Sequence, residues 1–196
     1  AAKIFEQRIV AELKDLAMQG TTFSVSFSSI PDIEELSLRI GANGFDNVEF
    51  LISPNKGEPL KPLAKIASGG EMSRFMLSLE NIISGLDNIA TLVFDEIDTG
   101  ISGHVAQVVA KKLNNISLAK QVIAVTHLPQ LASFADNHYL IKKDVVGEKT
   151  ITDVTILKEE DRVEEIVRLS GGAGSSINKM HAKELLQNAV NYKSIK

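Results

Sequence analysis

Two apolar runs in this sequence each end in residues that could do chemistry. "TLVFDE" ends on Asp95 and Glu96, and "VIAVTH" ends on Thr126 and His127. A carboxylate at the end of a buried strand can hold Mg²⁺ directly or through water, and its neighbour can orient or deprotonate an attacking water. Parallel strands joined by one crossover bring such ends to the edge where ligands of α/β sheets bind. The pattern favours the chemistry of a nucleotide hydrolase.

Each part of this pattern also has a simpler interpretation. A lone acidic pair after a strand fits a turn equally well, so Asp95 and Glu96 could merely cap one. His127 alone would be a turn residue, because Pro129 suits the first turn of a following helix. The combination of both strand ends is far more specific than either part.

A second feature is "SGGE", Ser68 to Glu71, which precedes apolar residues at helical spacing. This predicted apolar stripe consists of Met72, Phe75, Met76, Leu79, Ile82 and Ile83. Ser68 and Glu71 have the spacing of a capping box, which explains them but not Gly69 and Gly70. Each glycine in a helix costs about 1 kcal/mol relative to alanine. A helix start without side chains lets backbone N–H groups approach an anion closely, so the glycines predict a phosphate there.

Composition narrows the class of protein. The chain has 196 residues, 44% of them hydrophobic, which fits one domain with a real core. A formal charge of −4 argues against a dominant basic face for nucleic acid, and the lack of cysteine excludes disulfides and thiol catalysis. No apolar run approaches the roughly 20 residues of a membrane span, and no signal peptide opens the chain. We expect a soluble intracellular protein, and the start without Met suggests a piece of a longer one.

Hydrophobic periodicity predicts an α/β fold. We expect helices over about 3–19, ended by Gly20, and over about 70–84, 102–117, 160–169 and 176–192, with one more after Pro129. The predicted strands are 22–28, 37–43, 47–53, 90–94 and 121–126, with a loop over 54–62 and an antiparallel edge hairpin over 137–143 and 150–157. Apolar runs that alternate with helices indicate parallel strands buried on both faces.

The order "ASGGE", "LVFDE", "TH" resembles that of the signature motif, Walker B motif and switch histidine in ABC-type ATPase heads. The longer stretches "LAKIASGGEMSR", "TLVFDEIDTGISG" and "VTHLPQLASFAD" are similar to the C-terminal lobe of the RecN family of bacterial DNA repair proteins, relatives of the SMC proteins. The likeness runs from about residue 45 to 172. It implies the C-terminal half of an ABC-type P-loop NTPase head, with mostly parallel core strands flanked by helices and antiparallel edge strands.

The resemblance also implies a division of the chain. In the family, two ATPase lobes at opposite ends of one polypeptide are separated by an antiparallel coiled coil. Residues 1–19 would then be a helical stub of the coiled-coil arm, and residues 20–196 the C-terminal lobe of the head. An ordinary amphipathic helix packed on the domain is the alternative for the first segment.

Roles for individual residues follow from the resemblance alone. Asp95 would bind Mg²⁺, Glu96 would be the catalytic base, and His127 would sense the γ-phosphate. The residues that would face ATP bound by a second head are Ser68, Gly69, Gly70 and Glu71. The implied partners are the N-terminal lobe of the same polypeptide, a second head in an ATP-dependent homodimer, and DNA through the family only, in the bacterial cytoplasm at the nucleoid. Ser102 departs from general ABC heads, where an Asp is common in the D-loop.

Two short matches to nucleotide-binding motifs are decoys. "LSGG" at 169–172 follows the Walker B motif instead of preceding it, and its glycines fit the end of a helix. "GEKT" at 147–150 has Glu148 where a P-loop needs glycine, and it reads as a hairpin turn. The sequence contains no P-loop, so the chain carries half of an active site and is expected to be inactive alone. A non-catalytic interaction module derived from such a head is the alternative function.

Overall fold

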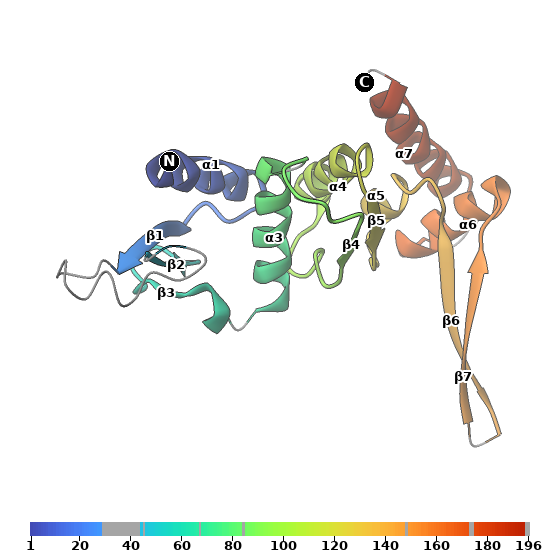
Figure 1. Ribbon diagram of the computed structural model, residues 1–196. Helices are drawn as coiled ribbons and strands as arrows, with labels where there is room; N and C mark the ends of the chain where they lie inside the picture. The colour runs from blue at the N-terminus through green and yellow to red at the C-terminus, as the bar shows by residue number, and fades with distance from the viewer. Residues whose placement is uncertain are drawn as a thin grey trace, which may run out of the picture. The chain divides into compact units, whose positions relative to one another are not determined.

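The structure is a computed structural model that describes residues 1–28, 44, 46–66, 68–83, 85–147, 149–172 and 175–194 (Figure 1). The chain forms two compact units, Ala1–Asn88 and Ile89–Lys196. The expectation of one domain is therefore wrong. Each unit buries an apolar cluster of its own, which is the physical condition for a separate compact unit. No helix in the described part of the chain combines the length and apolar character needed to cross a bilayer.

The first unit combines two helices with an antiparallel sheet. Its elements are α1 (Ala2–Asp15), β1 (Thr22–Ser28), β2 (Asn47–Ser53), β3 (Lys61–Pro62), the 3-10 turn Leu63–Lys65 and α3 (Gly69–Ile83). The sheet has the order β1-β2-β3, with β1 paired to β2 from Thr22↔Ser53 to Ser28↔Asn47. The strands predicted over 22–28 and 47–53 are confirmed, while 37–43 lies outside the described residues. The predicted loop over 54–62 is wrong at its end, because Lys61 and Pro62 pair with β2.

The core of this unit is built around Phe23. Its ring centroid lies 5.4 to 5.8 Å from those of Phe5, Phe50 and Phe75, which come from α1, β2 and α3. The buried cluster consists of Ile9, Leu13, Met18, Phe23, Ile52 and Phe75. Aromatic pairs at such distances contribute beyond the area they bury, so this cluster holds the helices against the sheet.

Helix α3 follows the predicted apolar stripe only in part. Phe75 is fully buried, and Leu79 and Ile82 pack against the cluster around Phe23. Met76 is 37% exposed, whereas Leu77, which the stripe omits, is fully buried. The stripe missed this second buried face because it also carries polar residues, such as Ser78, whose hydroxyl donates to the Arg74 carbonyl.

Helix α1 packs on the first unit and ends earlier than predicted. It ends at Asp15, and Ala17, not Gly20, takes the left-handed conformation with φ 61°. The Met18 N–H then donates to the Leu13 carbonyl, the bond that closes a Schellman-type helix end. At the other end of α1, Glu6 Oε1 accepts the Val25 N–H at 2.7 Å and ties the helix to strand β1. Its assignment to a coiled-coil arm stays a prediction.

The second unit follows the predicted alternation of strands and helices. Its elements are β4 (Thr91–Phe94), α4 (Gly103–Ser117), β5 (Gln121–Ala124), α5 (Pro129–Ala132), β6 (Tyr139–Val146), β7 (Lys149–Ile156), α6 (Glu159–Leu169) and α7 (Ser176–Ser194). Strands β4 and β5 are parallel as predicted, and β6 and β7 form the predicted antiparallel hairpin (Figure 1). Among the described strands, β4 with β5 and β6 with β7 form separate two-stranded sheets.

The parallel strands are not buried on both faces, which corrects the prediction. Val93 is 67% exposed, and Ile123 and Val125 are exposed as well. Val93 and Ile123 are paired in register, so their side chains lie on one face of the sheet. Helix α4 packs against β5, and among the described elements no second layer covers the exposed apolar face. The apolar runs reflect a burial that this chain alone does not provide.

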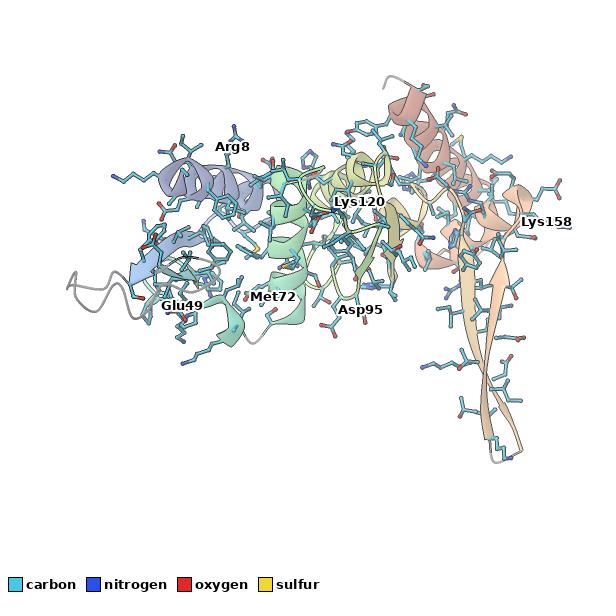
Figure 2. The ribbon with its side chains drawn as sticks, viewed as in Figure 1. Arg8, Glu49, Met72, Asp95, Lys120 and Lys158 are labelled. Carbon is cyan, nitrogen blue, oxygen red and sulfur yellow. The ribbon has the colours of Figure 1, made fainter. Side chains whose placement is uncertain are left out.

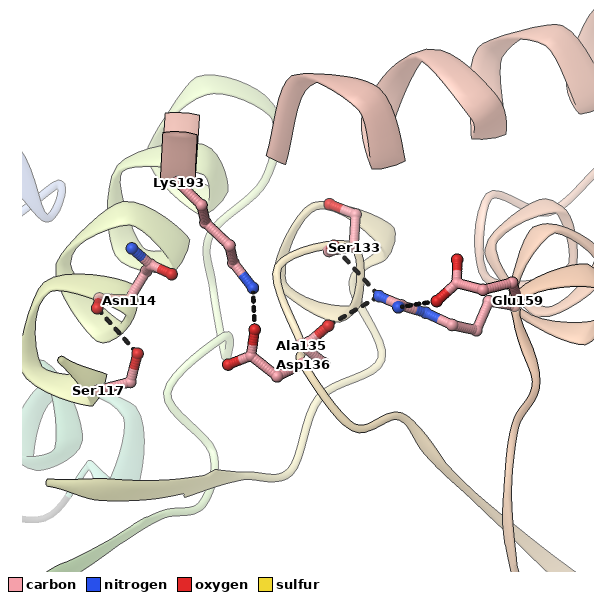
Figure 3. A network of polar contacts seen from close by, with 8 residues as sticks. Asn114, Ser117, Ser133, Ala135, Asp136, Glu159 and Lys193 are labelled. Atoms are coloured by element: carbon pink, nitrogen blue, oxygen red, sulfur yellow. Dashed lines mark hydrogen bonds and ion pairs between the residues drawn. The ribbon is translucent and has the colours of Figure 1, made fainter. Parts of the chain in front are cut away.

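Helices α6 and α7 close the second unit through a small core and a polar network. Their buried cluster with α5 consists of Ala132, Ile166, Val167, Ala182 and Leu185. The buried Arg162 guanidinium donates to the Ala135 carbonyl at 2.8 Å and to Glu159 at 2.9 Å (Figure 3). In the same view Lys193 donates to Asp136 at 2.6 Å. These contacts fasten both helices to the segment that follows His127.

The predicted glycine end of α6 is confirmed. Gly171 has φ 70°, and its N–H donates to the Arg168 carbonyl while the Gly172 N–H donates to Val167. These two bonds define a Schellman motif, for which glycine is the preferred residue. The "LSGG" stretch is thus a helix terminus.

Candidate functional site

The two chemistry-bearing strand ends meet at one edge of the parallel sheet, as predicted. Phe94 pairs with Ala124, and the next bond joins the Val125 N–H to the Phe94 carbonyl at 2.9 Å. Asp95 follows β4 directly, where Figure 2 labels it. The sheet register therefore brings Asp95 beside the segment that carries Thr126 and His127.

Asp95 and Glu96 differ in backbone conformation. Asp95 Oδ1 accepts the Glu96 N–H at 2.8 Å, and both residues are exposed. Glu96 has φ 57°, a left-handed conformation that costs a non-glycine residue roughly 1–2 kcal/mol. The Thr99 N–H donates to the Glu96 carbonyl and closes a tight turn. Glu96 thus breaks the alternation of the strand, and such strain is typical of functional positions.

The site contains one residue that sequence reasoning missed, Asp98. It is 4% exposed, and its Oδ2 accepts the Thr126 hydroxyl at 2.6 Å and the His127 N–H at 2.9 Å. The same oxygen lies 3.0 Å from Nδ1 of His127. One buried carboxylate therefore links the two strand-end segments.

A signal for Asp98 existed in the sequence but was weak. It is a third acidic residue only three positions after Asp95, opposite a threonine and a histidine on the next strand. A surface turn would show the same pattern, so only the structure distinguishes the two.

His127 stands at the surface on this buried support. Its side chain is 73% exposed although Nδ1 contacts Asp98. Thr126 Oγ1 in turn accepts the Leu128 N–H at 3.0 Å, and α5 begins at Pro129, as the sequence predicts. The exposed imidazole is thus fixed at its base while its outer edge faces solvent.

The donor set at the strand ends suits a magnesium ion that is held largely by a substrate. Among the described residues, no group of three or more His, Cys, Asp or Glu side chains could hold a metal by itself. Mg²⁺ rarely uses such a cage and is typically bound through one or two carboxylates together with phosphate oxygens and water. The exposed Asp95 and Glu96 carboxylates fit that arrangement.

The glycine-led helix lies in the first unit, apart in sequence from the strand-end residues. Helix α3 begins at Gly69, as predicted, and the Glu71 N–H donates to Ser68 Oγ at 3.4 Å. Gly69 is exposed and Gly70 is buried. Burial lowers the pKa of Arg74, and the negative charge of Glu71 partly offsets this effect. The long capping bond leaves the helix start lightly held.

Known proteins of similar sequence are all of one kind among the relatives compared. The chain is 46% identical over 188 residues to a "DNA repair protein RecN" from Halalkalibacterium halodurans, covering 95% of this chain and 33% of that protein. It is 41% identical over 202 residues to the RecN of Bacillus subtilis, covering 98% and 35% respectively. The chain is a RecN-like segment. It spans about a third of the length of these relatives, and no protein-family model matches it.

Solved structures support the same fold for the RecN-like segment. An Smc head domain derived from Pyrococcus yayanosii aligns with a TM-score of 0.55 at 17% identity, covering 86% of this chain and 29% of that one. An Smc head derived from Pyrococcus furiosus aligns with a TM-score of 0.52 at 16% identity, covering 86% and 38%. The expected fold, the C-terminal part of an SMC-type ATPase head, is confirmed.

Proposed function

We propose that this chain is the C-terminal part of an ATPase head that works in DNA repair. The observation that carries the proposal is the meeting of Asp95, Glu96 and His127 at one edge of a parallel sheet, tied together through Asp98. The relatives named as RecN DNA repair proteins support the cellular role. In the full-length protein, ATP binding would drive engagement of two heads, and hydrolysis would release them.

The strand-end residues would divide the work of hydrolysis. Asp95 would hold Mg²⁺, which neutralises phosphate charge when bound. Glu96, exposed beside it, would take a proton from the attacking water. His127 would contact the γ-phosphate through the exposed edge of its ring. ATP and Mg²⁺ are therefore the proposed ligands of the full-length protein.

An N-terminal lobe of the same polypeptide is the proposed partner within one head. The sequence contains no P-loop, so the lysine and backbone cradle for the phosphates must come from another segment. Val93, Ile123 and Val125 expose an apolar sheet face that such a lobe could cover. Residues 20–196 would form the C-terminal lobe, and residues 1–19 the beginning of a coiled-coil arm.

The start of helix α3 would serve a second head. Ser68, Gly69, Gly70 and Glu71 would face ATP bound by the partner head, because bare backbone N–H groups at a helix start favour a phosphate. This makes an ATP-dependent homodimer the active form. The RecN names further suggest a bacterial cytoplasmic protein that acts on DNA at the nucleoid.

A reconstitution experiment tests this function. The chain alone should bind Mg-ATP weakly and should not hydrolyse it, whereas co-expression with a P-loop-bearing N-terminal lobe should give ATPase activity. The matched control is the same pair with Glu96→Gln, which should assemble but hydrolyse slowly. A stable pair without any ATPase activity would contradict the proposal and favour a non-catalytic interaction module. Micromolar affinity of the isolated chain for Mg-ATP in calorimetry would refute its predicted dependence on the missing lobe.

A further inference from the structure

Asp98 is more deeply buried than the other strand-end carboxylates, and its contacts run to the histidine. It is 4% exposed, while Asp95 and Glu96 are exposed. Its Oδ2 receives the Thr126 hydroxyl, the His127 N–H and the approach of His127 Nδ1, all within 3.0 Å. A buried carboxylate is costly unless its oxygens are hydrogen-bonded, and here one oxygen gathers three contacts from the neighbouring strand end.

The contact with Nδ1 restricts the protonation of the imidazole. An ionised carboxylate only accepts hydrogen bonds, so a bond at 3.0 Å requires a proton on Nδ1. In the neutral ring the proton is then absent from Nε2, which becomes an acceptor directed away from Asp98. Since the side chain is 73% exposed, Nε2 is the ring nitrogen left for a substrate or water.

We propose that Asp98 is the positioning residue of this site, fixing both the ring orientation and the Nδ1–H tautomer of His127. The inference rests on the proposed function and deepens it. The backbone contact matters as much as the ring contact, because the His127 N–H and the Thr126 hydroxyl hold the main chain from which the ring projects. The Ile101 N–H donates to the Asp98 carbonyl, so the same residue also braces the turn after Glu96.

This geometry separates positioning from turn-capping. A residue that only caps a turn needs the backbone N–H and the hydroxyl, and it would leave the exposed imidazole free to rotate. Asp98 additionally reaches Nδ1, a contact that has no role in capping. A readout on the ring itself therefore distinguishes the two roles.

The first test uses this chain without nucleotide. Long-range proton–nitrogen NMR on nitrogen-15 histidine should show the Nδ1–H tautomer for His127, with His127→Gln identifying its signals. Asp98→Asn should abolish that preference, because an amide can donate as well as accept. The matched control is Asp136→Asn, the same change at an exposed carboxylate paired with Lys193, and it should leave the His127 signals unchanged. An Nε2–H tautomer in the unmodified chain, or an unchanged tautomer in folded Asp98→Asn, would overturn the inference.

The second test measures hydrolysis in the full-length protein. Removing the carboxylate that orients a functional histidine typically costs about 10- to 100-fold, and we expect a loss of that size in kcat for Asp98→Asn with a nearly unchanged KM for ATP. A loss in KM alone would contradict the positioning role. If the unmodified full-length protein hydrolyses no ATP, the proposed function fails, whereas the NMR result still decides the role of Asp98 toward His127.

Discussion

The two compact units carry their candidate residues in opposite ways. In the second unit, Asp98 binds two neighbouring strand ends with contacts of 2.6 to 3.0 Å and leaves His127 projecting from a fixed base. In the first unit, the start of α3 has glycines where side chains would be, and its capping bond is 3.4 Å long. One site is organised by this chain's own side chains, and the other offers mainly backbone.

This difference suggests where each site obtains its precision. Catalytic groups must be held in place before the substrate arrives, which is what a buried, fully engaged carboxylate achieves. A backbone anion site needs only access and the helix dipole, and its ligand completes it. The comparison predicts that changes in the second unit affect chemistry, while changes at the α3 start affect docking.

The sharpest test separates Glu96 from Asp95 in the full-length protein. Glu96→Gln keeps the size and hydrogen bonding of the side chain but removes the base, so hydrolysis should slow by about 10²- to 10⁴-fold while Mg-ATP stays bound. Asp95→Asn weakens the metal site and should impair both nucleotide binding and head dimerisation. Sedimentation with Mg-ATP should give a stable dimer for the Glu96 variant and mostly monomer for the Asp95 variant. Identical behaviour of the two would refute this division of labour.

The docking role of the first unit is tested by Ser68→Arg. A bulky side chain in the space proposed for the partner's phosphate should lower full-length ATPase activity by about 10²-fold, because small misplacements of reacting groups cost that much. The fold should lose no more than the roughly 1 kcal/mol of a helix cap.

Ser68→Ala is the matched control for this change. It loses the same 3.4 Å capping bond but leaves the space open, so its free energy of unfolding should resemble that of Ser68→Arg. Its ATPase activity should stay close to the unmodified level. If the arginine variant also retained activity, the α3 start would have no role in docking.

The sequence predicted the elements of the second unit well because local signals there are strong and agree with one another. Strands β4 and β5 are short apolar runs, α4 and α6 are amphipathic, and a glycine pair ends α6. The sequence also placed Asp95, Glu96 and His127 together, because parallel pairing is a rule of topology and needs no side-chain detail. Their individual roles remain predictions.

What the sequence could not predict depends on tertiary contacts. The importance of Asp98 follows from burial and from three contacts that join segments nearly thirty positions apart. The early end of α1 depends on Ala17 adopting a conformation that sequence rules reserve for glycine, so Gly20 was the wrong choice. The exposure of Val93 could not be foreseen either, since an apolar run carries no information on which segment covers it.

The ends of α1 and α6 extend the comparison of the units to stability. Both helices end with a residue in the left-handed conformation, but it is Ala17 in one and Gly171 in the other. Ala17→Gly should therefore stabilise the first unit by about 0.5–1 kcal/mol, because relief of strain exceeds the added freedom of the unfolded chain. Gly171→Ala should destabilise the second unit by about 1 kcal/mol, and no atom lies within 4 Å of the added methyl to alter this. Chemical denaturation checks both signs, and equal signs would contradict the shared-end explanation.

The smallest expected effect concerns the response of the units to acid. All four histidines lie in residues 89–196, so histidine titration can act directly only on the second unit. Burial lowers the pKa of His138, Arg162 lowers it further, and Glu165 partly offsets both. Below pH of about 6.5 the unfolded chain therefore binds a proton at this position before the folded chain does, and the second unit loses stability until the folded pKa is reached. Hydrogen exchange at pH 7 and pH 5.5 should show reduced protection in β5 and α6 but not in β2. His138→Gln should remove the difference between the two pH values, and a decrease that persisted in this variant would assign the acid sensitivity to other groups.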